Sequence, residues 1–247
     1  MTRLLCLLLL GFLLLPCPVA SSAEPPLRVA CLGDSLTAGD GDDEGGGGYP
    51  ARLQQRLQAS RPGSQVRSFG LSGQTARMVL EGYEQHRSQV KEALAFKPDV
   101  VCLWVGSNDL WYLYEYGDPD GAAEAADARQ YRQAVRATVD AFRGKGVRVV
   151  LALLDDQSKR PVAVDGQAFP GISQAERQRM GRQVKVYNDL LRAEAARAGC
   201  GLADFSASPV FTARATLADD GNHPNARGYD RLAEVWWTAL QAVLKKK

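Results

Sequence analysis

The chain has 247 residues, of which 45% are hydrophobic and 23% are charged. These fractions are ordinary for a globular protein and exclude a fibrous protein, a disordered tail and a protein with several membrane spans. Lys and Arg total 30 and Asp and Glu total 28, a net charge of +2 that gives no electrostatic reason to expect nucleic acid as a partner.

Residues 1–23 have the pattern of a secretory signal. Arg3 supplies the positive start, residues 4–15 form an uncharged apolar run, and small residues at 21–23 offer a cleavage site. The apolar run is shorter than the ~20 residues that a membrane-spanning helix needs. We therefore predict a signal peptide over residues 1–23 and one mature domain over residues 24–247, exported to the periplasm or the medium without a membrane anchor. A retained anchor is the alternative.

Three cysteines remain after residue 23, namely Cys31, Cys102 and Cys200. Their number is odd and no C-x-x-C pair occurs, so the sequence indicates neither a disulfide scaffold nor a zinc site. Cys31 and Cys102 lie inside apolar runs, which is typical of small buried side chains. One disulfide stays open as an alternative in an exported protein.

Short apolar runs alternate with longer helical patterns along the mature chain. In chain order, the predicted elements are a strand at 27–32, a helix at 49–60, a strand at 66–69, a largely helical stretch at 79–96, a strand at 100–105, a helix at 122–143, a strand at 147–154, a helix at 173–198, a short strand at 201–205 and a helix at 225–244. This alternation predicts a parallel sheet with helices on both faces, in a single domain.

Two connections are unusual. Residues 40–48 are acidic and rich in glycine, and we interpret them as a solvated rim. Residues 154–171 form a polar connection longer than most, and their length alone suggests a lid.

Ligands bind beyond the carboxyl ends of the strands in an open parallel sheet. The residues that follow the strands are therefore the candidates for a site. Residues 33–36, 70–73 and 106–109 follow the first three strands, and residues 220–224 precede the last helix. All four segments are expected to meet at one edge of the sheet.

A hydroxyl nucleophile needs a base to take its proton and a third group to orient that base. The mature chain has two histidines. We place His86 on a polar helix surface, whereas His223 lies in a turn before a helix, where functional residues concentrate. Ser35 is the candidate nucleophile, His223 the base and Asp220 the orienting group. A helix N-cap is the structural alternative for Ser35.

An oxyanion needs hydrogen-bond donors aimed at it. The N–H groups of Ser35 and Gly73 and the side-chain amide of Asn108 are the candidates, since glycine also permits close approach of a substrate. Gly73 and Asn108 are each compatible with a plain turn, but four site segments at one edge together favour a function.

Competing motifs do not match. The G-x-S-x-G elbow needs glycine at position 37, where Thr37 stands, and neither a G-x-G-x-x-G helix start nor a P-loop is present. Residues 40–45 suggest a calcium loop, but Ala51 stands where that loop needs Glu. Two histidines exclude a His-rich metal site, so we expect no metal and no cofactor.

These segments, in this order, resemble the sequence blocks of the SGNH hydrolases, also called GDSL lipases or esterases. Residues 33–36, Gly-Asp-Ser-Leu, resemble the block that carries the nucleophile, and residues 72–75 resemble the block whose glycine N–H joins the oxyanion hole. Residues 106–109 are similar to the G-x-N-D block, and residues 220–224 to the block with the catalytic Asp and His. The usual asparagine before the second block's glycine is absent, and residues 69–71 read Phe-Gly-Leu instead.

The resemblance implies the flavodoxin-like SGNH hydrolase fold, a three-layer α/β/α sandwich around a five-stranded parallel sheet. It also implies metal-independent hydrolysis of esters or thioesters by Ser35, His223 and Asp220, with Ser35, Gly73 and Asn108 around the oxyanion. Asp34 and Asp109 belong to the same blocks, and we interpret them as structural acids that tie loops to backbone donors.

The substrate is less defined. Trp111 and Tyr112 follow Asn108 and are candidates for the wall of the substrate pocket, with packing beneath a loop as the alternative. Aromatic rings suit sugars and acyl chains alike, so small acyl esters, lysophospholipids and O-acylated sugars all stay open. A thioesterase of the same family, or a non-catalytic glycan-binding protein with a broken triad on the same scaffold, is the alternative function. The sequence does not determine the oligomeric state.

Overall fold

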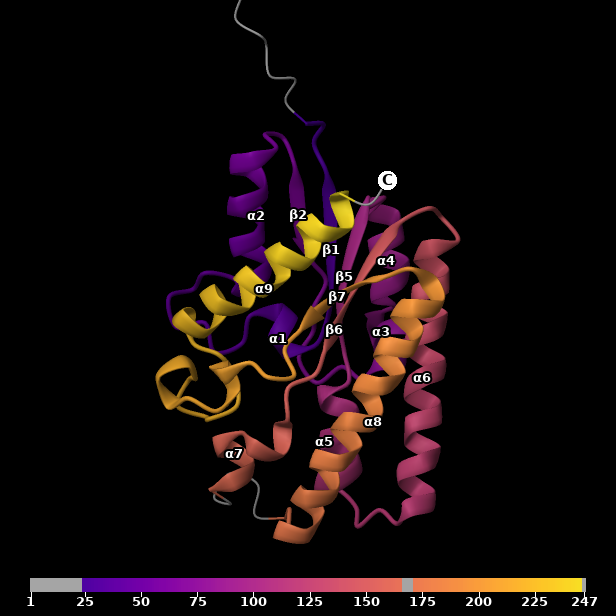
Figure 1. Cartoon of the computed structure of the whole chain (residues 1–247), viewed down its shortest axis with the longest axis vertical. Helices are drawn as coiled ribbons and strands as arrows, with labels where there is room; N and C mark the ends of the chain where they lie inside the picture. The colour runs from indigo at the N-terminus through magenta and orange to yellow at the C-terminus, as the bar shows by residue number, and fades with distance from the viewer. Residues whose placement is uncertain (1–23, 166–170, 246–247) are drawn as a thin grey trace, which may run out of the picture.

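The computed structural model describes residues 24–165 and 171–245 (Figure 1). The predicted signal peptide at residues 1–23 lies outside the described residues. Within the described ranges, no helix combines the length and the apolar character needed to cross a membrane.

Five parallel strands form the central sheet in the order β2-β1-β5-β6-β7. Their bounds are Arg28–Gly33 for β1, Gln65–Ser68 for β2, Val100–Trp104 for β5, Arg148–Leu153 for β6 and Gly201–Asp204 for β7. Each of the five predicted strands agrees with one of these to within one residue at either end. The strand order reverses between β1 and β5, so the carboxyl ends of these two neighbours form the crevice where ligands bind in such sheets.

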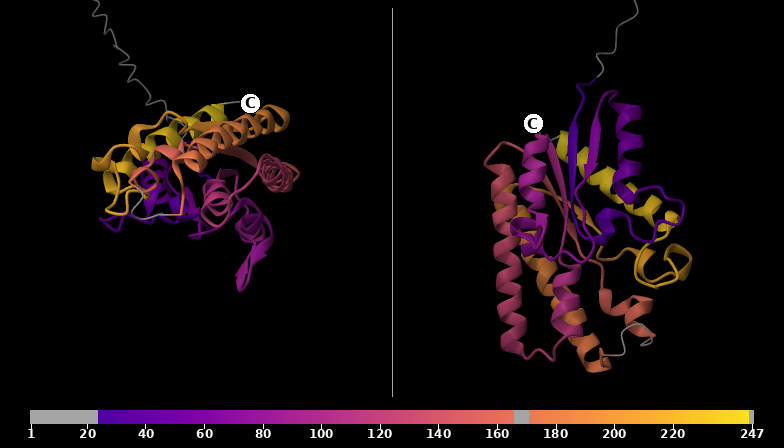
Figure 2. Two further views of the ribbon diagram at one scale, coloured as in Figure 1. Left: turned by 90° about the horizontal axis from the view of Figure 1, so that it is seen from below. Right: turned by 180° about the vertical axis from the view of Figure 1, so that it is seen from behind.

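The helices cover both faces of the sheet (Figures 1 and 2). On one face, α2 (Gly48–Ser60) packs against α9 (Ala226–Lys245), which lies over β6 and β7. On the other face, α6 (Gly121–Arg143) and α8 (Gln174–Ala198) pack together over β6. The predicted three-layer α/β/α fold with a five-stranded parallel sheet is confirmed.

An aromatic cluster joins the sheet to the α2 and α9 layer. Trp104, the last residue of β5, stacks on Phe205 with ring centroids 4.2 Å apart, and Trp236 of α9 stacks on Tyr49 of α2 at 5.2 Å. Trp104 and Trp236 also meet edge to face at 6.1 Å, and all four rings are fully buried. Because α9 is fixed by these contacts, the segment that enters α9 has a fixed place at the edge of the sheet.

The stretch at residues 79–96, predicted to be largely helical, is helical at both ends, but its middle is not helical and was not predicted. The structure instead has two short helices joined by a two-stranded antiparallel hairpin that projects from the body of the protein (Figure 2). The four elements are α3 (Ala76–Glu81), β3 (Gly82–Tyr83), β4 (His86–Arg87) and α4 (Gln89–Phe96). His86 is exposed as predicted, but it lies on this hairpin rather than on a helix.

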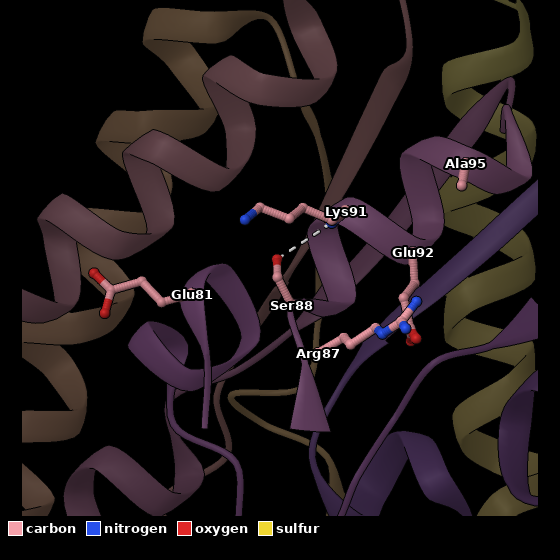
Figure 3. Close-up of a pocket in the computed structure, with 6 residues that line it drawn as sticks. All are labelled: Glu81, Arg87, Ser88, Lys91, Glu92 and Ala95. Carbon is pink, nitrogen blue, oxygen red and sulfur yellow. Dashed lines mark hydrogen bonds between the residues drawn. The ribbon is translucent and has the colours of Figure 1, made fainter. Parts of the chain in front are cut away.

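The backbone conformation of Gly82 and the helix cap of Ser88 explain why the predicted helix is interrupted. Gly82 has a φ of +90°, which ends α3, and Glu84 turns the hairpin with a φ of +50°. The Ser88 side chain then accepts a hydrogen bond from the Lys91 N–H at 3.2 Å and caps α4 (Figure 3). The same hydroxyl donates to the Leu80 carbonyl oxygen at 2.5 Å, which ties the start of α4 to the end of α3.

Short helices also occupy segments that we predicted as loops. They are α1 (Ser35–Ala38), α5 (Ser107–Glu115), η1 (Gln157–Lys159), α7 (Pro161–Val164), η2 (Pro209–Phe211) and η3 (Arg214–Thr216). Part of the suggested lid, residues 166–170, lies outside the described residues. The described part of that connection is packed into the protein, because Gln157 and Arg160 are buried.

The acidic loop at residues 40–48 is not simply a solvated rim. Asp42 forms a partly buried ion pair with Arg52 at 2.7 Å and accepts the Gly48 N–H at 2.9 Å. Asp43 accepts the Ala226 N–H at 2.9 Å, at the start of α9. These carboxylates therefore fasten the loop to α2 and α9. The three described cysteines are buried and free.

Candidate active site

Ser35 stands where β1 ends and α1 begins. The preceding Asp34 caps α1 by accepting the Leu36 N–H at 3.0 Å. Ser35 is therefore the first residue of the helix and not its cap. Its N–H is one of the helix-start donors that have no partner within the helix. The residue is partly exposed, and no hydrogen bond among the described residues uses its N–H.

The turn that carries Asp220 and His223 has a backbone shape fixed by its own hydrogen bonds. The Ala218 N–H donates to the His223 carbonyl oxygen at 2.8 Å. Leu217 and Pro224 form an isolated antiparallel bridge that closes the turn. This turn leads directly into α9, whose position the aromatic cluster fixes.

Ser35, His223 and Asp220 form a continuous series of hydrogen bonds. His223 Nε2 lies 2.9 Å from Ser35 Oγ, and His223 Nδ1 lies 2.6 Å from Asp220 Oδ2. The structure thus brings together the three residues that the sequence nominates as nucleophile, base and orienting group.

The Asp220 carboxylate determines the tautomer of His223. Partial burial raises the Asp220 pKa, but hydrogen bonds from the His223 side chain and from the N–H groups of Asn222 and His223 outweigh it, so the pKa is lowered. An ionised carboxylate only accepts hydrogen bonds, so His223 Nδ1 is the donor in their contact. In the neutral imidazole, Nε2 is then an acceptor that faces the Ser35 hydroxyl.

The loop after β2 lies directly against α1. A Cβ at Gly70 would lie 2.5 Å from the Ala38 nitrogen, so only glycine fits there. The Leu71 N–H donates to the Gly33 carbonyl oxygen at 3.2 Å. Gly73 follows with a φ of +78°, and no hydrogen bond among the described residues uses its N–H. The Gly73 N–H is therefore a free donor on a loop bonded to the strand end before Ser35.

Asn108 lies in the first turn of α5, directly after β5. Its side-chain amide donates to the Gln74 carbonyl oxygen at 3.0 Å, which joins α5 to the loop of Gly73. That bond uses one of the two amide N–H groups and leaves the other. The three candidate oxyanion donors thus lie on segments that are bonded to each other around the ends of β1, β2 and β5.

Trp111 and Tyr112, the two candidates for the pocket wall, differ in exposure. Trp111 is buried in the core, as the packing alternative predicts. Tyr112 is 38% exposed, and its hydroxyl donates to the Gly73 carbonyl oxygen at 2.9 Å. Tyr112 is therefore the one of the two that borders the candidate site.

A buried arginine supports the turn from inside the protein. Arg160 is 1% exposed and forms two hydrogen bonds with the Asp155 carboxylate, at 2.8 and 2.7 Å. Its third nitrogen donates to the Asn222 side-chain oxygen at 2.7 Å, and the guanidinium lies over the Phe211 ring at 4.5 Å. Asn222 sits between Asp220 and His223, so this arginine fixes the turn that presents the imidazole.

Two motif acids hold the loops together, as the sequence suggests. Asp34 caps α1, and Asp109 accepts the Ala76 N–H at 3.0 Å, at the start of α3. Burial raises the pKa of Asp34 to about 6, against the hydrogen bond from Leu36 and the charge of Arg160. Burial likewise raises the pKa of Asp109 to about 7, against its bond to Ala76.

The GDSL-like lipase/acylhydrolase family model matches residues 31–231, a range that contains every residue described above for the site. The chain belongs to this family. The resemblance found in the sequence is thereby confirmed. This GDSL family contains lipases and acylhydrolases, which hydrolyse carboxylic esters.

Known relatives include an acetylxylan esterase from Xylanibacter ruminicola, to which the chain is 30% identical over 231 residues. The match covers 90% of this chain but 45% of that relative, so the chain spans about half the length of the curated protein. Among solved structures, TesA superposes with a TM-score of 0.64 at 23% identity, covering 87% of this chain and 99% of TesA. A variant of Axe2, an acetyl-xylooligosaccharide esterase from Geobacillus stearothermophilus, superposes at 0.62 with 22% identity, covering 88% and 95%.

The sequence did not reveal the buried pair of Arg160 and Asp155. The polar connection at 154–171 was noted for its length, but nothing local links it to Asn222, which is 62 residues from Arg160. Within residues 24–165 and 171–245, no three His, Cys, Asp or Glu side chains are grouped so that they could hold a metal ion.

The buried pair predicts a non-additive effect on stability. Replacing Arg160 by Met leaves the Asp155 carboxylate buried without its cation, and we expect the free energy of unfolding to fall by about 3–5 kcal/mol. The double variant Arg160→Met, Asp155→Leu removes both charges, and most of that loss is recovered. Urea denaturation of the single and double variants measures both values. Additive losses would contradict the account.

The raised pKa of Asp109 predicts a pH-dependent stability. Its pKa is about 7 in the folded protein and about 4 when unfolded, so the folded state binds more protons between these values. Its contribution is therefore fully present below about pH 4 and is lost as the pH rises through about 7.

The variant Asp109→Asn keeps an acceptor for Ala76 but does not titrate. Its melting temperature relative to the wild type should therefore increase from pH 4 to pH 8, as followed by circular dichroism. A difference that does not change with pH would show that this carboxyl is not the titrating group.

Proposed function

We propose that this chain is an exported serine esterase that hydrolyses short-chain carboxylic esters, with O-acetylated sugars as its substrate class. The observation that carries the proposal is the series of hydrogen bonds from Ser35 Oγ through His223 to Asp220, at 2.9 and 2.6 Å. The order is the one that a base-activated hydroxyl nucleophile requires.

The reaction proceeds in two halves. His223 Nε2 takes the proton of Ser35 as its Oγ attacks the ester carbonyl carbon, and the resulting imidazolium is stabilised by the Asp220 carboxylate. The oxyanion is held by the N–H groups of Ser35 and Gly73 and by the Asn108 amide. The tetrahedral intermediate then breaks down as His223 gives its proton to the leaving alcohol, and an acyl-enzyme on Ser35 remains.

Water completes the cycle. His223 takes a proton from a water molecule, the hydroxide oxygen attacks the acyl carbon, and Ser35 leaves with the proton returned by His223. The products are a carboxylic acid and an alcohol, and the enzyme is restored. Every proton transfer passes through the single nitrogen that faces Ser35.

The substrate class rests on the relatives and on the site together. The acetylxylan esterase from Xylanibacter ruminicola acts on an acetylated sugar polymer, as its name states, and matches nine-tenths of this chain. A non-catalytic glycan-binding protein on this scaffold predicts a broken triad, whereas all three side chains are in hydrogen-bonding contact. Export rests on the signal pattern of residues 1–23 and implies action in the periplasm or the medium.

Loss of the Ser35 hydroxyl should abolish ester hydrolysis. We expect the variant Ser35→Ala to lower kcat for p-nitrophenyl acetate by about 10⁴-fold or more, because the other groups cannot form an acyl-enzyme. Ser60→Ala, at the exposed end of α2, is the matched control and should retain the wild-type rate. Equal activity in Ser35→Ala and the wild type would remove Ser35 from its role.

Loss of the Asn108 amide removes a proposed oxyanion donor together with the hydrogen bond to the Gln74 carbonyl oxygen. A donor that bonds the oxyanion but not the bound ester contributes ~10²–10³ in kcat, so Asn108→Ala should lower kcat and kcat/KM equally and leave KM unchanged. Steady-state kinetics with p-nitrophenyl acetate separate these parameters. A rise in KM with kcat intact would assign Asn108 to ground-state binding instead.

A further inference from the structure

A groove of about 500 Å³ adjoins the candidate active site. It lies between the β3-β4 hairpin and α5, and Gly73 forms part of its wall. Three tyrosines line it, namely Tyr83 from the hairpin and Tyr112 and Tyr116 from α5 and its end. Its volume is in the range of small-ligand sites.

The groove and the candidate active site share the loop that carries Gly73 and Gln74. The Tyr112 hydroxyl donates to the Gly73 carbonyl oxygen at 2.9 Å. The N–H of Gly73 is a proposed oxyanion donor. Gln74, which also lines the groove, accepts the hydrogen bond of Asn108 at 3.0 Å. A molecule in the groove therefore lies against the loop that would hold the oxyanion.

The tyrosine rings are unusually exposed for large aromatic side chains. Tyr83 is 48% exposed and Tyr116 is 75% exposed. The Tyr112 and Tyr116 rings lie 5.9 Å apart between centroids, tilted by 43°. Aromatic surface gathered in one groove and left open to solvent marks a binding site more often than a structural need.

The lining favours a sugar chain over an acyl chain. A pyranose or furanose ring has an apolar C–H face that packs on an aromatic ring and a rim of hydroxyls that needs hydrogen-bond partners. The groove offers such partners in Ser72, Glu84 and His86. Among the described residues that line it, Met78 is the single aliphatic side chain, whereas an acyl chain requires aliphatic walls.

We propose that this groove binds the sugar units next to the acetylated one, so that Tyr83, Tyr112 and Tyr116 select oligosaccharide esters over simple acetate esters. This inference rests on the proposed esterase function and extends it with a binding subsite. The β3-β4 hairpin, which the sequence did not predict, then has a role, because it supplies one wall of the subsite.

A second groove of about 420 Å³, lined by the end of α3, the end of the hairpin and α4, offers a control (Figure 3). Its described lining is dominated by charged side chains, namely Glu81, Arg87, Lys91 and Glu92, and holds no aromatic ring. It also lacks Gly73 and every other residue of the candidate site. Lys91→Ala is therefore a variant near the hairpin but outside the proposed subsite.

The test compares kcat/KM for an acetylated xylooligosaccharide with kcat/KM for p-nitrophenyl acetate. The ratio should fall about tenfold in Tyr116→Ala and again in the double variant Tyr83→Ala, Tyr116→Ala, because each loses one aromatic contact with the sugar chain. Tyr116→Phe keeps the ring and should keep most of the ratio. Lys91→Ala should leave the ratio at the wild-type value.

A binding measurement separates this inference from the proposed chemistry. Calorimetric titration with the same oligosaccharide should give a Kd for the Ser35→Ala variant. The Kd should be about tenfold or more higher when Tyr83→Ala and Tyr116→Ala are combined with Ser35→Ala in one protein. Tyrosine-dependent binding without turnover by the wild type would refute the esterase function and support the subsite. Turnover of both esters with a ratio unaffected by the tyrosine variants would overturn the subsite alone. A tyrosine-dependent preference for a lysophospholipid over the oligosaccharide would overturn it as well.

Discussion

The hydrogen bond between His223 Nε2 and Ser35 Oγ joins two residues that are 188 positions apart in the chain. A bond of 2.9 Å between such distant side chains requires that both backbones be held to within a fraction of that distance. Ser35 is held because β1 is a buried interior strand and Asp34 caps the helix that begins there. His223 lies in a turn outside the five strands of the sheet, so its position depends on the packing of the turn and of α9.

The turn of His223 is fixed by contacts with α9 and with the connection that follows β6. Gly228 of α9 comes so near that a Cβ there would lie 2.7 Å from the Pro224 Cβ and 2.3 Å from the Thr216 carbonyl oxygen. Arg160, between η1 and α7, reaches the same turn through Asn222. A buried ion pair of this kind contributes little net stability, because desolvation of the charges offsets their attraction. Its value here is in orientation, since two guanidinium nitrogens hold Arg160 on Asp155 while the third is directed at Asn222 in the turn.

The substrate side of the site is built differently from the catalytic side. The triad rests on buried strands, buried helix caps and an internal ion pair. The tyrosine groove is formed by exposed rings on a two-stranded hairpin and at the end of a helix. Such surface elements tolerate change without disturbing the core. Under the proposed function, one hydrolytic centre can therefore be kept while the hairpin and α5 set which esters reach it.

The sequence by itself determined the fold class, the five strands and the candidate triad. Strand periodicity is local, and the short motifs around Ser35 and Asn108 follow strand ends, where a parallel sheet gathers them, while the motif around His223 precedes the last helix. The hairpin at residues 82–87 escaped prediction because apolar and polar residues on either side of Gly82 fit one continuous helix, and the backbone of one glycine decided otherwise. Only the tertiary structure placed Arg160 beneath Asn222, buried Trp111 and left Tyr112 beside Gly73. These outcomes depend on which distant surfaces meet, and packing between elements leaves no signature in the local sequence.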